Sequence, residues 1–151
     1  MSERKRQAGF SLAEMLVVIA IIGIAITIGI PPVNEQVRIA EVRAAADDLS
    51  LHLRAARMIA VTKHKTIIFT VNADPTNTFR YEGNDGLQKV ISMPGRVRIA
   101  TGSDNSISFF QNGSVDATSA IVIESNVSNQ LERWTATVNT VGLTKLARQR
   151  I

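Results

Sequence analysis

An almost entirely apolar stretch near the N-terminus places the strongest constraint on this chain. It runs from Phe10 to Val33, and Glu14 is the only charged residue in it. As an α-helix these residues would extend about 36 Å, which is enough to cross a hydrocarbon core of about 30 Å. Three cations at positions 4–6 precede the stretch and favour a cytoplasmic N-terminus. The sequence therefore predicts a single membrane crossing, with the rest of the chain on the far side.

A cleavable secretory signal is the competing interpretation of this stretch. Such a signal needs small residues shortly after its apolar part. Here the apolar part ends in Ile28-Gly29-Ile30-Pro31-Pro32-Val33, which places large residues at those positions. The pattern favours a retained anchor.

Glu14 is the one residue of the predicted anchor whose insertion into the membrane is energetically unfavourable. An unpaired carboxylate immersed in the membrane is unfavourable by about 2–3 kcal/mol. Two explanations remain open from the residues alone. Glu14 lies at the membrane interface and reaches water, or a neighbouring chain supplies a cation for it.

The segment Gly9-Phe10-Ser11-Leu12-Ala13-Glu14, followed by an apolar run, resembles the signature of type IV pilins and type II secretion pseudopilins. The resemblance implies cleavage between Gly9 and Phe10 by a prepilin peptidase, then methylation of the Phe10 amine. It also implies that Glu14 faces the Phe10 amine of an adjacent subunit, which would neutralise a buried carboxylate. Pro31 falls where family members often have a helix-bending proline. Ala13 departs from the commoner isoleucine or valine.

The resemblance and the patterning together divide the chain into four segments. Residues 1–9 are the expected cleaved leader, and residues 10–33 are the transmembrane and assembly helix. Pro31-Pro32 predicts a kink or break, after which Asn34 can cap a restarted helix. Residues 34–62 form the amphipathic continuation of the helix, with an apolar stripe at three- and four-residue spacing: Val42, Ala45, Leu49, Leu53, Ala56 and Ala60.

Residues 63–151 are expected to form an antiparallel β domain, because the apolar period changes from helical spacing to alternation. Gly83-Asn84-Asp85-Gly86 is a strong hairpin turn. The predicted fold is α+β and type IV pilin-like, with one long helix packed on antiparallel sheet. The expected strands are 66–71, 78–82, 87–93, 97–100, 107–110, 120–125, 133–139 and 142–146.

The later half narrows the resemblance to pseudopilin H and the FimT-type minor pilins. The order of an aromatic strand and glycine turn (residues 106–114), followed by a terminal hairpin with Trp134 and Gly142, is similar to theirs. A major pilin more often carries a cysteine pair near its C-terminus, and this chain has no cysteine.

A basic group near the C-terminus is a candidate DNA-binding surface. FimT-type pilins are associated with DNA capture during transformation, often through a glycine-arginine-x-arginine end. The matching stretch here is Gly142-Leu143-Thr144-Lys145, in which one cation is lost and the other is a lysine. Without the first nine residues the net charge of +4 falls to about +2, a weak argument for nucleic acid. The alternative is a solvated basic tail; the candidate residues are Lys145, Arg148, Arg150, Arg96 and Arg98.

Other candidate sites have simpler explanations. Glu82, Asn84 and Asp85 offer too few ligands for a dedicated calcium site and are explained by turn chemistry. His52 and His64 are expected to be helix-surface residues, without a clustered carboxylate or cysteine. No phosphate-binding glycine loop or nucleophile motif occurs, so neither an enzyme, a metal nor a cofactor is expected.

The sequence thus predicts a minor pilin or pseudopilin, a structural subunit of a type IV pilus or type II secretion pseudopilus, at the tip or in the initiating complex. Its expected location is the bacterial inner membrane, with a periplasmic C-terminal domain before assembly. The expected partners are other pilin subunits, the prepilin peptidase and the membrane. A DNA-binding minor pilin and a single-pass protein that never polymerises are the two alternatives.

Overall fold

The computed structural model describes residues 10–73, 75–127 and 130–150, and the side chains of residues 28–33 and 150 are outside this description. The described residues begin with one long helix, α1, which runs from Leu12 to Lys63. Strands follow in the order β1 (Ile67–Asn72), β2 (Thr78–Glu82), β3 (Gln88–Ser92), β4 (Arg98–Ile99), β5 (Ser106–Phe109), β6 (Ser119–Val127), β7 (Gln130–Val138) and β8 (Thr144–Arg150).

The chain divides into two compact units, residues 1–36 and residues 37–151. In the first unit, Ser11 caps α1, because its hydroxyl accepts a hydrogen bond from the amide of Ala13 at 3.2 Å. The helix continues through Pro31 and Pro32 without interruption. Asn34 therefore lies inside the helix, and the expected role as the cap of a second helix is wrong: helical residues on both sides carry α1 past the missing amide donors. Whether Pro31 bends α1 stays a prediction.

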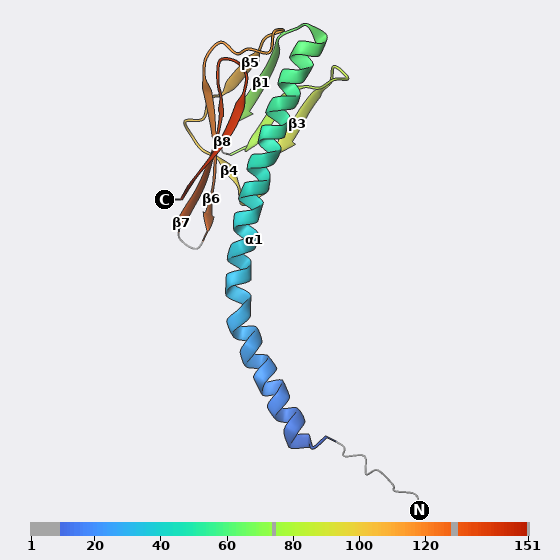
Figure 1. The fold of residues 1–151 in the computed structure, drawn as a ribbon, viewed down its shortest axis with the longest axis vertical. Helices are drawn as coiled ribbons and strands as arrows, with labels where there is room; N and C mark the ends of the chain where they lie inside the picture. The colour runs from blue at the N-terminus through green and yellow to red at the C-terminus, as the bar shows by residue number, and fades with distance from the viewer. Residues whose placement is uncertain (1–9, 74, 128–129, 151) are drawn as a thin grey trace, which may run out of the picture. The chain divides into compact units, whose positions relative to one another are not determined.

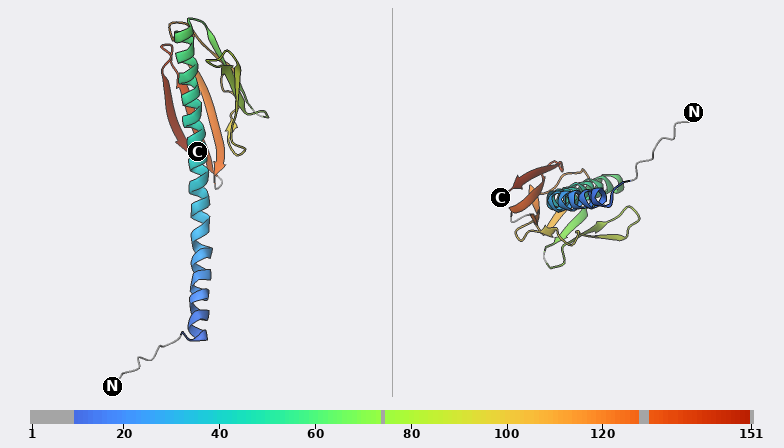
Figure 2. Two further views of the ribbon diagram at one scale, coloured as in Figure 1. Left: turned by 90° about the vertical axis from the view of Figure 1, so that its right-hand side faces the viewer. Right: turned by 90° about the horizontal axis from the view of Figure 1, so that it is seen from below.

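In the second unit, α1 places its apolar stripe in the core. All six predicted positions are buried, and Ala46 and Ser50 are buried beside them. The stripe consists mainly of alanine and leucine, so the backbone of α1 can approach the sheets closely. Figures 1 and 2 show this part of the helix, drawn in teal to green, running alongside the strands.

The strands form two antiparallel sheets of four strands each, a division that the sequence interpretation did not specify. The first sheet has the order β3-β2-β1-β5 and the second the order β4-β6-β7-β8. The predicted strands all occur, with bounds shifted by up to four residues. The division into two sheets depends on pairing between distant segments, which alternation along a strand does not encode.

Both sheets turn one face toward a shared core. The first sheet contributes Phe69, Phe79 and Tyr81, whose rings stack with centroids 5.3–5.5 Å apart. The second sheet contributes Ile121, Ile123, Ala136 and Val138. Because residues paired across antiparallel strands share a face, the registers fix which side chains of β8 face inward.

Candidate functional site

The first described residues show the surroundings of the predicted processing and assembly site. Phe10 is 73% exposed and directly precedes the Ser11 cap. Glu14 lies in the first turn of α1, where a carboxylate interacts favourably with the positive end of the helix dipole. Gly9, on the other side of the predicted cleavage point, lies outside the described residues.

Among the described residues, no helix combines the length and the apolar character needed to cross a membrane.

The predicted C-terminal basic group lies in a strand, and the side chains of Lys145 and Arg148 are exposed. Lys145, Arg148 and Arg150 all belong to β8, which pairs with β7 along its length. Lys145 is opposite Thr137, whereas Arg148 is opposite Trp134, so these two cations point to opposite faces of the sheet.

Arg96 and Arg98 do not extend this basic group. Arg98 lies in β4, at one edge of the second sheet, and β8 is the other edge. β6 and β7 separate the two edge strands, which places them about 14 Å apart at the usual spacing of about 4.8 Å. The sheet topology therefore distributes the five candidate DNA-binding residues over two edges and two faces.

Arg148 has a structural partner. Its Nε donates to one carboxylate oxygen of Glu132 at 3.0 Å, and its Nη2 donates to the other at 2.9 Å. Glu132 is fully buried on the inner face of β7. The hydrogen bonds and the charge of Glu132 raise the pKa of Arg148 above its ordinary value. This bidentate pair anchors the C-terminal strand.

Arg57 connects α1 to two turns that are distant in sequence. Its Nε donates to the carbonyl of Gly113 at 2.8 Å, and its Nη2 donates to the carbonyl of Val141 at 3.1 Å. Gly113 follows β5, and Val141 lies in the turn between β7 and β8. One guanidinium group therefore joins both sheets to the helix.

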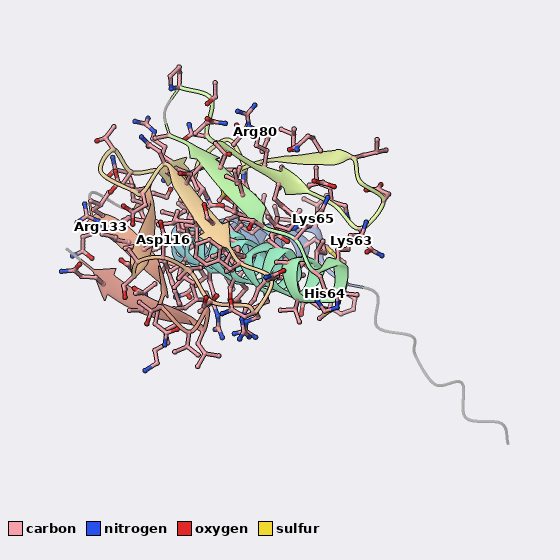
Figure 3. All side chains as sticks on the ribbon, turned by 90° about the horizontal axis from the view of Figure 1, so that it is seen from above. Lys63, His64, Lys65, Arg80, Asp116 and Arg133 are labelled. Carbon is pink, nitrogen blue, oxygen red and sulfur yellow. The ribbon has the colours of Figure 1, made fainter. Side chains whose placement is uncertain are left out.

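The two histidines differ in their surroundings. His52 is half-buried, its Nδ1 lies 2.8 Å from the hydroxyl of Tyr81, and its ring packs against Phe79. The expectation of a helix-surface His52 is wrong, because the first sheet covers this side of α1. His64 is exposed, as expected, at the end of the helix beside Lys63 and Lys65 (Figure 3).

The turn around Glu82, Asn84 and Asp85, which has too few ligands for a calcium site, contacts two lysines. Lys63 donates to the carbonyl of Asn84, and Lys65 forms a salt bridge with Glu82. The carboxylate of Asp85 accepts a hydrogen bond from the amide of Leu87, as expected for turn chemistry. Among the described residues, no group of three or more histidine, cysteine or acidic side chains is arranged to hold a metal ion.

Comparison with protein families matches two parts of the chain. The prokaryotic N-terminal methylation motif matches residues 4–30, and the type II transport protein GspH family matches residues 45–142. The second match covers most of the chain. The chain belongs to the GspH family. It is a minor pilin or pseudopilin subunit with the fold of the type IV pilin superfamily, as the sequence predicts.

Solved structures show the same fold for this GspH-family chain. The minor pseudopilin EpsH from the type 2 secretion system of Vibrio cholerae is 12% identical, with a TM-score of 0.55 over 71% of this chain and 96% of that chain. The type IV minor pilin FimU of Pseudomonas aeruginosa is 15% identical, with a TM-score of 0.55 over 73% and 90%. No curated protein sequence matches the chain.

The family domain contains contacts that the sequence interpretation missed. Arg57 lies outside the apolar stripe that the sequence predicts, and no local pattern indicates its two carbonyl partners. The sequence does contain an indication that Glu132 points inward, since it alternates with Trp134, Ala136 and Val138 on one face of β7. A carboxylate at an inward position of a strand requires a partner, and Arg148 supplies one.

Proposed function

We propose that this GspH-family subunit is cleaved after Gly9, is methylated on the amine of Phe10, and is held in the bacterial inner membrane by residues 10–33 until it joins a fibre. The fibre is a type IV pilus or a type II secretion pseudopilus, and the subunit takes part in its tip or initiating complex. The family and the minor subunits with the same fold support this assignment.

The exposure of apolar side chains on the first half of α1 is the observation that carries the proposal. Leu16, Val17, Val18 and Ile19 are consecutive and all exposed, so the apolar surface surrounds the helix. Helices that are apolar all round are buried in protein or lipid. The remaining exposed large apolar residues of this part are Phe10, Leu12, Met15, Ile21, Ile22, Ile24 and Ile26.

Lipid and neighbouring subunits would cover this surface in turn. In the membrane, acyl chains surround residues 10–33, and the cytoplasmic N-terminus is accessible to the prepilin peptidase. In the fibre, the corresponding helices of neighbouring subunits replace the lipid. In both environments water is excluded from the segment. Its one charged side chain, Glu14, must therefore be neutralised there.

Glu14 and the Phe10 amine supply that neutralisation. Cleavage after Gly9 creates a new positive charge at Phe10, four residues before Glu14. The geometry of α1 places Glu14 in the first helical turn, close to the end that a neighbour's amine would approach. Pairing of the two buried charges offsets the cost of removing each from water.

Mass spectrometry of the N-terminus tests the processing step. Membrane-derived protein is expected to begin at methylated Phe10, and a Gly9→Val variant is expected to retain Met1. Gly23→Val is the matched control, because a Cβ at Gly23 has no neighbouring atom within 4 Å and the change lies away from the cleavage point. A wild-type chain that still begins at Met1 would reject the proposal.

A further inference from the structure

Three arginines from separate segments line a pocket of about 350 Å³ at the edge of the second sheet. Arg38 comes from α1, Arg96 from the turn before β4, and Arg98 from β4 itself. The other lining residues are Gly95, Glu124, Ser125, Asn126 and Leu131.

The backbone that carries Arg96 and Arg98 is held in place. The amide of Val97 donates to the carbonyl of Pro94 at 2.8 Å, which closes the turn. The hydroxyl of Ser125 donates to the carbonyl of Arg96 at 2.6 Å and fixes the turn to β6. Arg98 is paired with Glu124 across the β4–β6 ladder. A ligand would therefore find these arginines on an ordered backbone, which reduces the entropy lost on binding.

Carboxylates near the pocket neutralise it only in part. Glu124 forms a salt bridge with Arg133 at 3.1 Å, and Glu41 forms a longer one with Arg96 at 3.9 Å. Glu35 lies within one turn of Arg38. The three lining arginines and Arg133 thus outnumber the three carboxylates named here by one positive charge. A phosphodiester carries one negative charge, and its oxygens match the fork of donors on a guanidinium group.

The position of Arg38 in the chain indicates where such an anion would come from. Arg38 is five positions after Val33, the end of the predicted anchor, and five positions span at most about 17 Å even when fully extended. The headgroup layer occupies about 5–8 Å on each side of the hydrocarbon core. Arg38 is thus held within reach of the phosphates of the outer leaflet, and those phosphates are the most concentrated anions at that depth.

We propose that Arg38, Arg96 and Arg98 bind the phosphate of an anionic phospholipid headgroup. This inference rests on the proposed insertion of residues 10–33 in the membrane. The contact keeps the folded domain at the membrane surface while the subunit waits for assembly. Withdrawal of the helix from the bilayer then removes the lipid from the pocket.

Native mass spectrometry of the full chain in detergent tests the binding. The probes are dioleoylphosphatidylglycerol and dioleoylphosphatidylcholine, supplied in equal amounts. The wild-type chain is expected to retain the anionic lipid about fivefold or more over the zwitterionic one. The triple variant Arg38→Gln, Arg96→Gln, Arg98→Gln is expected to lose this preference.

A second triple variant controls for overall charge. Arg54→Gln, Arg80→Gln and Lys89→Gln remove the same three charges from exposed positions outside the pocket. This variant is expected to keep the preference for the anionic lipid. An unchanged preference in the pocket variant, or an equal loss in the control, would overturn the proposal.

A photocrosslinking residue at position 95 identifies the occupant in cells. Gly95 lines the pocket, and a Cβ there has no atom within 4 Å, so the substitution fits. A phospholipid adduct on the membrane-bound chain is expected. Adducts only with protein or only with DNA would overturn the proposal and assign the pocket to an acidic side chain of a neighbouring subunit or to DNA. The N-terminal residue of the same sample reports processing separately, so a failure of the lipid contact can be distinguished from a failure of the proposed processing.

Discussion

A Cβ atom on Gly142 would lie 2.1 Å from the carbonyl oxygen of Gly113, so the turn before β8 rests directly on the backbone of the turn after β5. Gly142 also has a φ of +78°, a conformation that residues with a side chain rarely adopt. Arg57 donates to the same carbonyl of Gly113. Glycine at both positions thus permits the two turns to approach each other closely. The contact of Arg57 with both turns depends on that approach.

Replacement of Gly142 by alanine is expected to lower the free energy of unfolding by about 2–5 kcal/mol. The unfavourable φ contributes about 1–2 kcal/mol, and the steric overlap contributes a further 1–3 kcal/mol. Gly102→Ala is the control for φ alone, because Gly102 has a φ of +105° and open space around its Cβ position. Denaturant unfolding of the full chain in detergent measures both variants, and equal losses would contradict the overlap.

The anchoring role of Arg57 predicts a loss of stability when its guanidinium group is removed. Arg57→Ala is expected to lower the free energy of unfolding by about 1.5–3 kcal/mol, because two backbone carbonyls lose a charged donor. Arg54, nearly one turn earlier, is exposed and is the matched control; Arg54→Ala is expected to change stability by less than about 0.5 kcal/mol. Hydrogen exchange should report faster opening at residues 139–143 in the Arg57 variant, and unchanged exchange there would contradict the anchor.

Arg148 and Lys145 point to opposite faces of the sheet. We therefore expect their replacement to affect the unfolding midpoint differently. Arg148→Gln removes the bidentate partner of the buried Glu132 and is expected to lower the unfolding midpoint clearly. Lys145→Gln removes an exposed charge from the other face and is expected to leave the midpoint nearly unchanged. Adding Glu132→Gln to Arg148→Gln should recover part of the loss, because no charge then remains buried. Equal effects of the two single variants would contradict the register of β8.

Tyr81 is the only tyrosine of the chain, so its titration can be followed by ultraviolet absorbance. Burial, and then the negative charge of Asp48, raise its pKa above 10.0. Above pH 10 the unfolded chain loses this proton first, so the free energy of unfolding is expected to fall as the pH rises toward the folded-state pKa. Tyr81→Phe should remove that part of the decline, and Asp48→Asn should lower the tyrosinate midpoint. A midpoint at or below 10 would contradict the buried position.

How much of this structure can be predicted from the sequence depends on the range of the interactions. The buried stripe of α1 follows from spacing within the helix, and the segment around Gly9, Phe10 and Glu14 is contiguous. The stripe and the N-terminal segment can therefore both be recognised from local sequence. The division into two sheets, the partners of Arg57 and the pocket around Arg38 join residues that are dozens of positions apart. No local period encodes such contacts, since they depend on which strands pair.

Glu14 provides the test that separates assembly from processing. Glu14→Ala leaves the Gly9–Phe10 bond and the apolar segment intact, so the variant is expected to be cleaved and methylated. Under the proposed pairing, the Phe10 amine of the neighbour would lose its buried partner, and the amount incorporated into sheared fibres is expected to fall at least about tenfold. Asp47→Ala is the control, because it removes an exposed acidic side chain from the same helix outside the apolar segment. Normal incorporation of the Glu14 variant would show that the proposed charge pair does not hold the subunit in the fibre.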